Sequence, residues 1–359
     1  MAYIINKDTT TNELKFTLKN VEVTYANTLR RSILSMIPIV GLKTEPHENN
    51  QMIIHKNTSR LNNEITKHRF SCIPIHINLE EEQDVSRYSI ELHVKNDTEN
   101  IVEVTTKDIL IKDTITGKYL TQDERDNIFP ADPITKDHIL ITRLYPRIHL
   151  TSEIETIHLT CPMSVCYAME NSVYNAVSTC GYGFTPDEMK QKQGWDKVKN
   201  TQPDKENWYL HEGKRFFKPN SFDFKIESVG VYDNVTIVQL GCKMIINRLK
   251  LLLQNVQNRS IEIKSGDTIE PSSDITIPHD NYTMGKLLEN TLYMLYYEQE
   301  KKLSFVAYKK PHPHVDYGTI RVIFRNENDT SDVEIYKMLF SSIQYAIPIY
   351  EKIAKEIEI

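Results

Sequence analysis

The chain has 359 residues, a length that predicts two or three domains. Hydrophobic residues make up 40% of it and charged residues 26%, a balance that can bury a core and excludes a disordered chain. The formal net charge of −6 argues against a protein whose main task is to grip nucleic-acid phosphates, because such proteins usually carry a basic excess on the binding domain.

The cysteines and the N-terminus indicate a reducing, intracellular compartment. An odd, sparse set of five cysteines is typical of free thiols rather than of a disulfide framework. The N-terminus lacks the basic-then-apolar layout of a signal peptide, and the longest near-apolar run, residues 33–42, is shorter than a membrane span. We therefore expect no membrane contact. The cysteines are Cys72, Cys161, Cys166, Cys180 and Cys242.

The stretch from Thr24 to Pro38 predicts a short amphipathic helix, with Thr24 as N-cap and Pro38 as its stop. Two arginines, Arg30 and Arg31, follow each other at the edge of its apolar stripe. A helix this short is not stable alone, so we expect it to pack on other elements. The apolar stripe consists of Ala26, Leu29, Ile33 and Ile37.

The region after this helix predicts mainly strands. Ser59 is a candidate cap for a short helix that ends before Cys72, and the region from Ile75 to Asp137 is polar and β-like. Before the helix, Leu14–Leu18 also reads as a strand. The strands expected after it are residues 39–44, 52–55, 88–94, 101–105, 109–112, 139–144 and 155–159.

Residues 185–220 contain both tryptophans, many charges and several prolines, and we expect a long irregular surface segment there. A strand over residues 221–229 then leads into a long helix that begins at Asn234. Polar residues 254–260 suggest a link between domains. The helix's apolar stripe is Val235, Val238, Cys242, Ile245, Leu249, Leu252 and Val256.

The last hundred residues predict a smaller version of the same order. A short strand at 275–278 precedes a helix over 282–297 with Thr283 as a possible cap, and strands follow at 304–309 and 319–324. A long helix over 331–359 closes the chain, with a kink expected at Pro348. Its predicted stripe is Val333, Tyr336, Phe340, Ile343, Ile347, Tyr350 and Ile353.

The order strand, helix, strands, long helix thus occurs twice, and residues 24–29 echo residues 283–288. We predict an α+β fold in which two such dimerisation units lie in one chain and bury their helix stripes against each other as an intramolecular pseudo-dimer. The expected first unit is residues 1–45 with 172–254, interrupted by a β-rich insert at 46–171. A linker at 255–260 leads to the second unit at 261–359.

Three stretches of the first unit resemble the α-type subunits of multisubunit RNA polymerases. Residues 16–31 resemble the signature helix of that family, residues 57–74 its second motif and residues 222–230 the strand before its long dimerisation helix. The C-terminal part is similar to the small α-like partner, the archaeal L type, whereas the first part is similar to the large, archaeal D type. Thr283-Met-Gly285, residues 305–313 and the closing helix carry the second likeness.

The resemblance implies a non-catalytic assembly platform. In the family, the α-type pair forms first and recruits the two largest, catalytic subunits, and small polymerase subunits join the complex. DNA and RNA would then be contacted only through the holoenzyme. Cellular organisms encode the two α-like halves separately, and fused versions belong to some large cytoplasmic DNA viruses. A viral origin would place the protein in the host cytoplasm, at viral factories, and in the virion.

Carried over by position, the resemblance assigns two sets of residues. Arg30 and Arg31 would face a large subunit, supported by Glu64, His68 and Arg69 at the start of the insert. The core of the pseudo-dimer would be lined by Leu29, Ile33, Val238, Leu249, Leu287, Leu292, Phe340 and Ile343.

Departures from the family pattern limit what can be transferred. Some members hold zinc or an iron–sulfur cluster in the insert, but residues 75–159 contain no cysteine, so a four-thiolate site cannot form and we expect no metal or cofactor. Asn63 stands where the family has an acidic residue, and Tyr282 and Lys286 stand where the small partner has His and Asn.

Two functions of other classes stay open. One is a stand-alone thiol enzyme that uses Cys72 with His68, although no third orienting group is evident. The other is a single-stranded nucleic-acid-binding module built on Trp195 and Trp208 with the lysines around them. We interpret Cys161 and Cys166 as buried thiols and the Pro-flanked His312 and His314 as part of a rigid turn rather than metal ligands.

Overall fold

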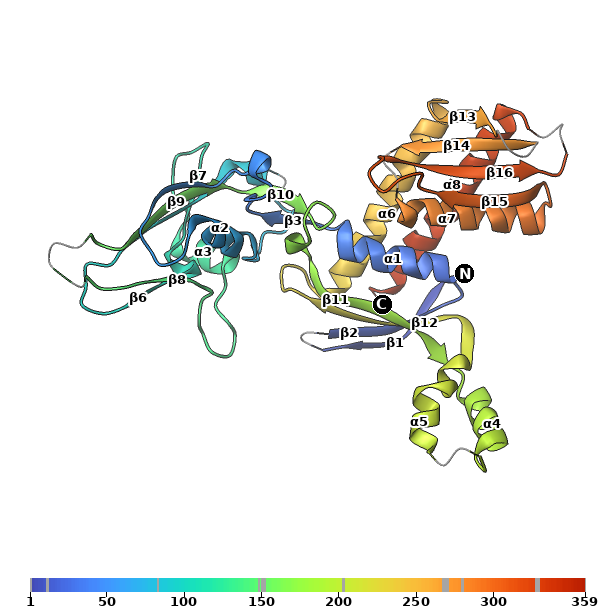
Figure 1. Ribbon diagram of the computed structural model, residues 1–359, viewed down its shortest axis with the longest axis horizontal. Coiled ribbons are helices and arrows are strands. Elements are labelled where there is room, and N and C mark those ends of the chain that lie inside the picture. The colour runs from blue at the N-terminus through green and yellow to red at the C-terminus, as the bar shows by residue number, and fades with distance from the viewer. Residues whose placement is uncertain are drawn as a thin grey trace. The chain divides into compact units, whose positions relative to one another are not determined.

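A computed structural model describes residues 2–10, 13–82, 84–147, 149, 153–201, 204–266, 271–278, 281–326 and 330–358. The chain divides into two compact units (Figure 1). Unit 1 consists of residues 1–34, 179–227 and 234–359, and unit 2 of residues 35–178 and 228–233. The three-domain boundaries predicted from sequence, with the insert at 46–171, stay a prediction.

Unit 1 contains two four-stranded sheets with the same strand order. The first is β1(Tyr3–Thr9)-β2(Glu13–Lys19)-β12(Phe217–Ser228)-β11(Val177–Pro186), and the second is β13(Glu262–Ser265)-β14(Ser272–Pro278)-β16(Tyr317–Phe324)-β15(Leu303–Lys309). Numbered along the chain, both sheets run first, second, fourth, third. We call the elements of the first sheet with their helices the first half and those of the second sheet the second half.

Each half has one helix after its second strand and a longer one after its fourth. These are α1 (Val23–Ser35) and α6 (Asn234–Gln257) in the first half, and α7 (Tyr282–Leu292) and α8 (Asp332–Glu356) in the second. The two long helices pack along each other, and α7 packs on both α8 and the sheet of its own half (Figure 1). Helix α7 continues into a π-helical turn, η6 (Tyr293–Gln299).

Unit 2 is built on the sheet β4(Ile53–Asn57)-β9(Thr156–Pro162)-β5(Tyr88–Lys95)-β7(Leu110–Asp113). The pairs β6(Val102–Thr105)-β8(Leu140–Leu144) and β10(Ser164–Tyr167)-β3(Pro38–Gly41) accompany it, with helices α2 (Asn63–Ser71) and α3 (Gln122–Ile128). One apolar core, which includes Phe70, Leu92 and Leu159, holds these elements together. Single turns of 3₁₀-helix lie at His47–Asn49, Val85–Arg87, Thr106–Asp108, Ser172–Tyr174 and Glu212–Arg215.

The predicted caps were wrong at three helices. Thr24 lies inside α1, which begins at Val23, and the backbone N–H groups of Tyr25 and Ala26 donate to the Glu22 carbonyl. Asn62 rather than Ser59 caps α2, its side chain accepting from the Ile65 N–H at 2.8 Å. Asn281 rather than Thr283 caps α7. Asparagine satisfies a free N–H as well as serine or threonine does, so residue type alone did not fix the position.

The segment 185–220 is not irregular, as predicted, but folds as helices α4 (Glu188–Val198) and α5 (Lys205–Leu210). Their aromatic side chains pack together, with the Trp195 and Trp208 rings 5.7 Å apart and Trp208 stacked on Phe216 at 6.0 Å. A Cβ on Gly194 would lie 2.9 Å from the Phe216 ring. This small cluster supplies the order that the polar composition did not reveal.

The closing helix begins after Ser331, whose side chain accepts from the Glu334 N–H, and runs through Pro348. Its predicted stripe is wrong at Val333, which is exposed. The buried residues are Ile335, Met338, Leu339, Ser342, Ile343, Ala346, Tyr350 and Ile353. The predicted helix end, Ile359, lies outside the described residues. Within the described ranges, each helix is too short or too polar to cross a membrane.

Candidate functional site

Helix α1 is the element through which the first half contacts the helices of the second. Its buried side chains are Tyr25, Ala26, Thr28, Leu29, Ser32 and Ile33. Three of these carry a hydroxyl group, and a buried hydroxyl needs a hydrogen-bond partner. Those partners lie on α6, α7 and α8.

Toward α6, the Ser32 Oγ donates to the carbonyl oxygen of Gly241 at 2.9 Å. A Cβ at Gly241 would lie 2.7 Å from Ile33 Cγ1, which is too close for a side chain to fit without movement. The two helices of the first half therefore touch at their backbones.

Toward α7, four side chains of the two helices form a polar seam. The Thr28 Oγ1 donates to the Thr283 carbonyl at 3.4 Å, and the Arg31 Nε donates to the Thr283 Oγ1 at 2.7 Å. The hydroxyls of Tyr25 and Thr291 share a hydrogen bond of 3.1 Å. Residues late in α1 meet residues early in α7, so the two helices run antiparallel.

Toward α8, the Tyr350 hydroxyl donates to the carbonyl oxygen of Tyr25 at 3.2 Å, and the two rings lie 6.1 Å apart. Burial raises the pKa of both phenols well above its usual range, so both hydroxyls stay protonated. Asn290 of α7 completes the seam by donating to the Glu22 carboxylate at 2.8 Å. The first and second halves are thus joined by hydrogen bonds as well as by apolar packing.

The predicted pseudo-dimer residues lie in the interior of unit 1, with one exception. Phe340 is only half-buried, on a flank of α8 rather than at its centre. The fully buried members are Leu29, Ile33, Val238, Leu249, Leu287, Leu292 and Ile343.

The sequence reasoning missed the hydroxyl residues of α1. Tyr25, Thr28 and Ser32 recur at three- and four-residue steps, the same spacing as the apolar stripe. That spacing was the available signal, but polar residues were left out of the stripe. Their partners are more than 200 residues away along the chain, so no local pattern could have supplied them.

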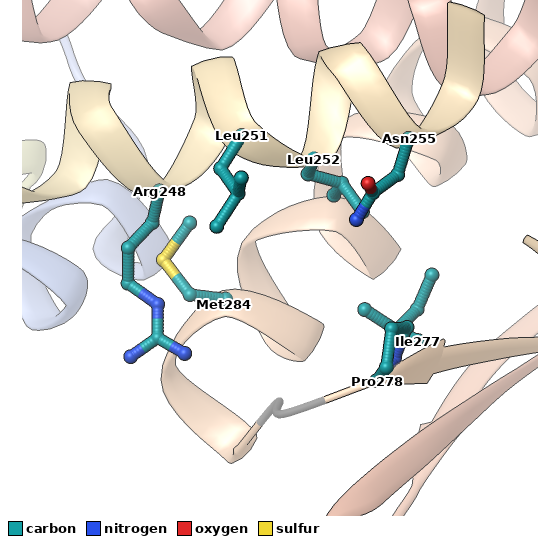
Figure 2. Close-up of a pocket in the computed structure, with 7 residues that line it drawn as sticks. All are labelled: Arg248, Leu251, Leu252, Asn255, Ile277, Pro278 and Met284. Carbon is teal, nitrogen blue, oxygen red and sulfur yellow. The ribbon is translucent and has the colours of Figure 1, made fainter. Parts of the chain in front are cut away.

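A surface hollow lies where α6 of the first half meets the second half. Arg248, Leu251, Leu252 and Asn255 of α6 form one side, and Ile277, Pro278 and Met284 form the other (Figure 2). Figure 2 shows the Arg248 side chain extending past Met284 on the way toward the start of α7. The hollow is mostly apolar, with one cation and one amide at its ends.

The two arginines of α1 have different surroundings. Arg30 is half-buried, and its Nε and Nη2 both donate to Asn27 Oδ1 at 3.0 Å within the helix. Arg31 is exposed, yet its Nε contacts the second half through Thr283. Arg31 therefore has an intramolecular contact in addition to any external one.

The remaining interface residues lie on α2 in unit 2. Glu64, His68 and Arg69 are all exposed, and the Arg69 Nη2 donates to the Leu140 carbonyl at 2.6 Å. The hydrophobic Ile65 beside them is also exposed. These side chains form one polar helix surface with an apolar residue in it.

The thiol and tryptophan alternatives find little in this geometry. Cys72 is exposed at the end of α2, where its backbone N–H contacts the His68 carbonyl. Burial raises the pKa of Cys166 to about 11 and those of Cys161 and Cys180 to about 12, so these three thiols stay protonated at neutral pH. Among the described residues, no group of three or more His, Cys, Asp or Glu could hold a metal ion.

The tryptophan segment is closed on itself. The Trp208 side chain is only 7% exposed within the α4–α5 cluster, so it has no free face for a nucleic-acid base.

A protein-family comparison matches the segment that these elements share. Residues 15–249, from β2 to α6, match the RNA polymerase Rpb3/Rpb11 dimerisation domain. The chain belongs to this family. The match includes α1 and α6, the two helices that contact the second half, and it covers most of the chain.

Individual relatives agree with this assignment. A Dictyostelium discoideum protein, DNA-directed RNA polymerases I and III subunit rpac1, is 27% identical over 201 residues, which cover 49% of this chain and 50% of that protein. The Schizosaccharomyces pombe DNA-directed RNA polymerase II subunit RPB3 is 22% identical over 313 residues, covering 81% of this chain and 98% of that protein. A Tetrahymena thermophila conjugation stage-specific protein is 24% identical over 300 residues, covering 68% of this chain and 92% of that protein.

Membership in the Rpb3/Rpb11 dimerisation family makes this an α-like RNA polymerase subunit of a structural, non-catalytic class. The thiol-enzyme interpretation of Cys72 and His68 is set aside on that ground. The site of interest is therefore a set of contact surfaces rather than a catalytic centre.

Proposed function

We propose that this chain is the assembly-platform subunit of a DNA-dependent RNA polymerase, in which two α-like halves pair within one polypeptide and dock the two largest subunits. The observation that carries the proposal is the repeated sheet order, first, second, fourth, third, with a helix after the second strand and a longer one after the fourth. Two copies of one architecture in one chain are what a fused heterodimer would leave.

The contacts between the copies support pairing. Helices α6 and α8 pack along each other, and the seam from α1 to Thr283, Thr291 and Tyr350 links the two halves. A covalent link between the halves would remove the cost of bringing two chains together, because it keeps their local concentration high. The pair is then ready for its partners at any concentration of the chain.

The docking surfaces we assign are the arginine edge of α1 and the polar surface of α2. Arg30 offers a guanidinium that can pair with a carboxylate in two parallel hydrogen bonds, a geometry suited to a protein interface. Glu64, His68 and Arg69 add charges of both signs on an exposed helix surface next to Ile65. Small polymerase subunits would join the same assembly, and DNA and RNA would be contacted only through the holoenzyme.

The order and length of the two halves resemble the fused subunit of the African swine fever virus RNA polymerase. On that resemblance we propose a viral chain that acts in the host cytoplasm, at viral factories, and is carried in the virion. The family comparison covers residues 15–249, so it supports the first half, and the sheet order in the second half is the support for fusion.

The test is affinity purification of the tagged chain from its native source, followed by mass spectrometry. We expect two much larger proteins, the catalytic subunits, to co-purify in amounts comparable to the tagged chain. Recovery of the chain alone under gentle conditions would sink the platform proposal. An Arg30→Glu variant should retain less of the larger proteins, because it reverses one charge at the edge of α1. The matched control Lys15→Glu reverses a charge on β2 and should co-purify as the unchanged chain does.

A further inference from the structure

Helix α6 has an unusual charge for this chain. Its charged residues are Lys243, Arg248 and Lys250, and residues 234–257 contain no aspartate or glutamate. The whole chain, in contrast, has a net charge of −6. A surface along α6 is therefore a local cationic region on an acidic protein.

The cations lie on the part of α6 that faces away from the core. Lys243, Asn247, Lys250, Leu251 and Gln254 follow each other at three- and four-residue steps, and we call them the α6 ridge. Leu251 is 60% exposed in the middle of this polar row. Burial of that side chain by a partner would remove apolar surface from water, so the ridge combines charge with an apolar anchor point.

The ridge is bordered by hollows on both sides. On one side is the hollow of Figure 2, where Leu251 and Met284 form an apolar wall beside Arg248. On the other, Lys243, Asn247 and Lys250 line a hollow against α8, whose Ala354 and Lys355 add an apolar surface and a further cation. Glu351 of α8 is the acidic residue there.

We propose that the α6 ridge docks an acidic, amphipathic segment of a protein partner. Its carboxylates would face Lys243, Arg248 and Lys250, and one apolar side chain would pack against Leu251 and Met284. Single surface ion pairs contribute little, so the apolar anchor is needed for a specific complex. The described residues that line the two hollows include no aromatic ring for stacking a base, which favours a protein segment over a single-stranded nucleic acid.

This proposal goes beyond the platform function and does not rest on it. The surfaces assigned to the large subunits are on α1 and α2, whereas the ridge is on α6.

The probe is a fluorescein-labelled helical peptide with glutamates on one side and leucines at three- and four-residue steps on the other. Fluorescence anisotropy with the full chain should show binding that weakens as salt is raised, since exposed charges are screened. The ridge variant Lys243→Glu/Lys250→Glu should weaken binding about tenfold or more. Leu251→Asn should weaken it as well, without a change in charge.

The matched control is Lys309→Glu/Lys337→Glu, which reverses two exposed lysines of β15 and α8 and gives the same net charge. We expect it to bind the peptide like the unchanged chain. All four lysines are exposed, so circular dichroism should show the same melting for both double variants.

Three results would overturn the proposal. The first is equal loss of binding in the ridge and control variants, which would indicate a general charge effect. The second is undiminished binding of a peptide with glutamine in place of each glutamate. The third is an oligothymidylate that binds more tightly than the peptide and is lost with the ridge variant, which would make the ridge a phosphate site.

Discussion

Gly241 shows how a single residue sets the distance between two helices. Its missing side chain lets α1 approach until the Ser32 hydroxyl reaches the Gly241 carbonyl at 2.9 Å. An ideal Cβ there would stand 2.7 Å from Ile33 Cγ1, and Ile33 is buried and has little room to move. The contact between α1 and α6 depends on this glycine.

Gly241→Leu should therefore destabilise the protein by about 2 kcal/mol or more, because overpacking forces the two helices apart. Gly183→Leu is the control, since Gly183 is exposed on β11 and a Cβ there meets nothing within 4 Å. Urea denaturation followed by circular dichroism measures both. Equal midpoints for the two variants would contradict the close approach.

Three histidines stand in a row on the exposed side of the main sheet of unit 2. His93 is paired in register with His158, and their rings are 4.4 Å apart. His55, at the irregularity in β4, lies 4.5 Å from His158 on the other side. Burial first, and then the neighbouring rings of His93 and His55 and the charge of Lys95, lower the pKa of His158, while Glu91 acts in the opposite direction.

This row makes stability depend on pH. Because the folded-state pKa of His158 lies below its unfolded value of about 6.5, the unfolded chain takes up a proton more readily. The contribution is present above about pH 6.5 and is lost as the pH falls through the folded pKa.

His158→Gln should accordingly reduce the loss of unfolding free energy between about pH 7.5 and about pH 5.5. His76, whose pKa burial also lowers, supplies a background that is the same in both proteins. The control is His211→Gln, an exposed histidine outside the row. A wild-type slope in the His158 variant would show that the row does not couple protonation to folding.

At the scale of elements, α1 combines apolar packing with hydrogen bonds on one helix surface. Leu29 and Ile33 fill the interior, and Tyr25, Thr28 and Ser32 bond to the neighbouring helices. Apolar contact supplies most of the stabilisation, while each buried hydrogen bond adds about 1 kcal/mol and fixes how the helices are placed.

Leu29→Glu should cost on the order of 3–5 kcal/mol, because it removes a buried side chain and puts a carboxylate in its place. Val23→Glu is the matched control in the same helix. Val23 is exposed in the first turn of α1, where a negative charge is favourable to the helix dipole. Thermal unfolding should separate the two variants clearly. A Leu29→Glu protein as stable as the control would mean that α1 does not pack as described.

The sequence predicted the elements that carry strong periodicity and missed those that do not. The long helices α6 and α8 were expected from their stripes, and the buried Leu249 and Ile343 lie where the spacing predicted. The short helices α3, α4 and α5 were missed because their residues are polar and their order comes from contacts such as Trp195 with Trp208.

The candidate site divides in the same way. Its apolar members follow from local patterns, because burial repeats along each helix. Its polar members do not, since the partner of Tyr25 is Thr291 and the partner of Ser32 is Gly241. Such pairs depend on how distant elements meet, and no local propensity contains that information.

At the scale of the whole molecule, the account rests on two halves that hold each other through side chains. The sheet order is the same in both halves, and α6 packs along α8. If this packing is what joins the halves, the peptide link between α6 and β13 keeps them at a high local concentration but is not required for their association.

The most direct measurement is cleavage of that link. A protease site placed between Gln257 and Ile261, beyond the end of α6, would separate the halves covalently. Size-exclusion chromatography with light scattering after cleavage should show both fragments in one peak with the mass of the intact chain, and Leu29→Glu should make them separate. Fragments of the unchanged sequence that elute apart, at concentrations where the intact chain is folded, would contradict the pairing of the two halves.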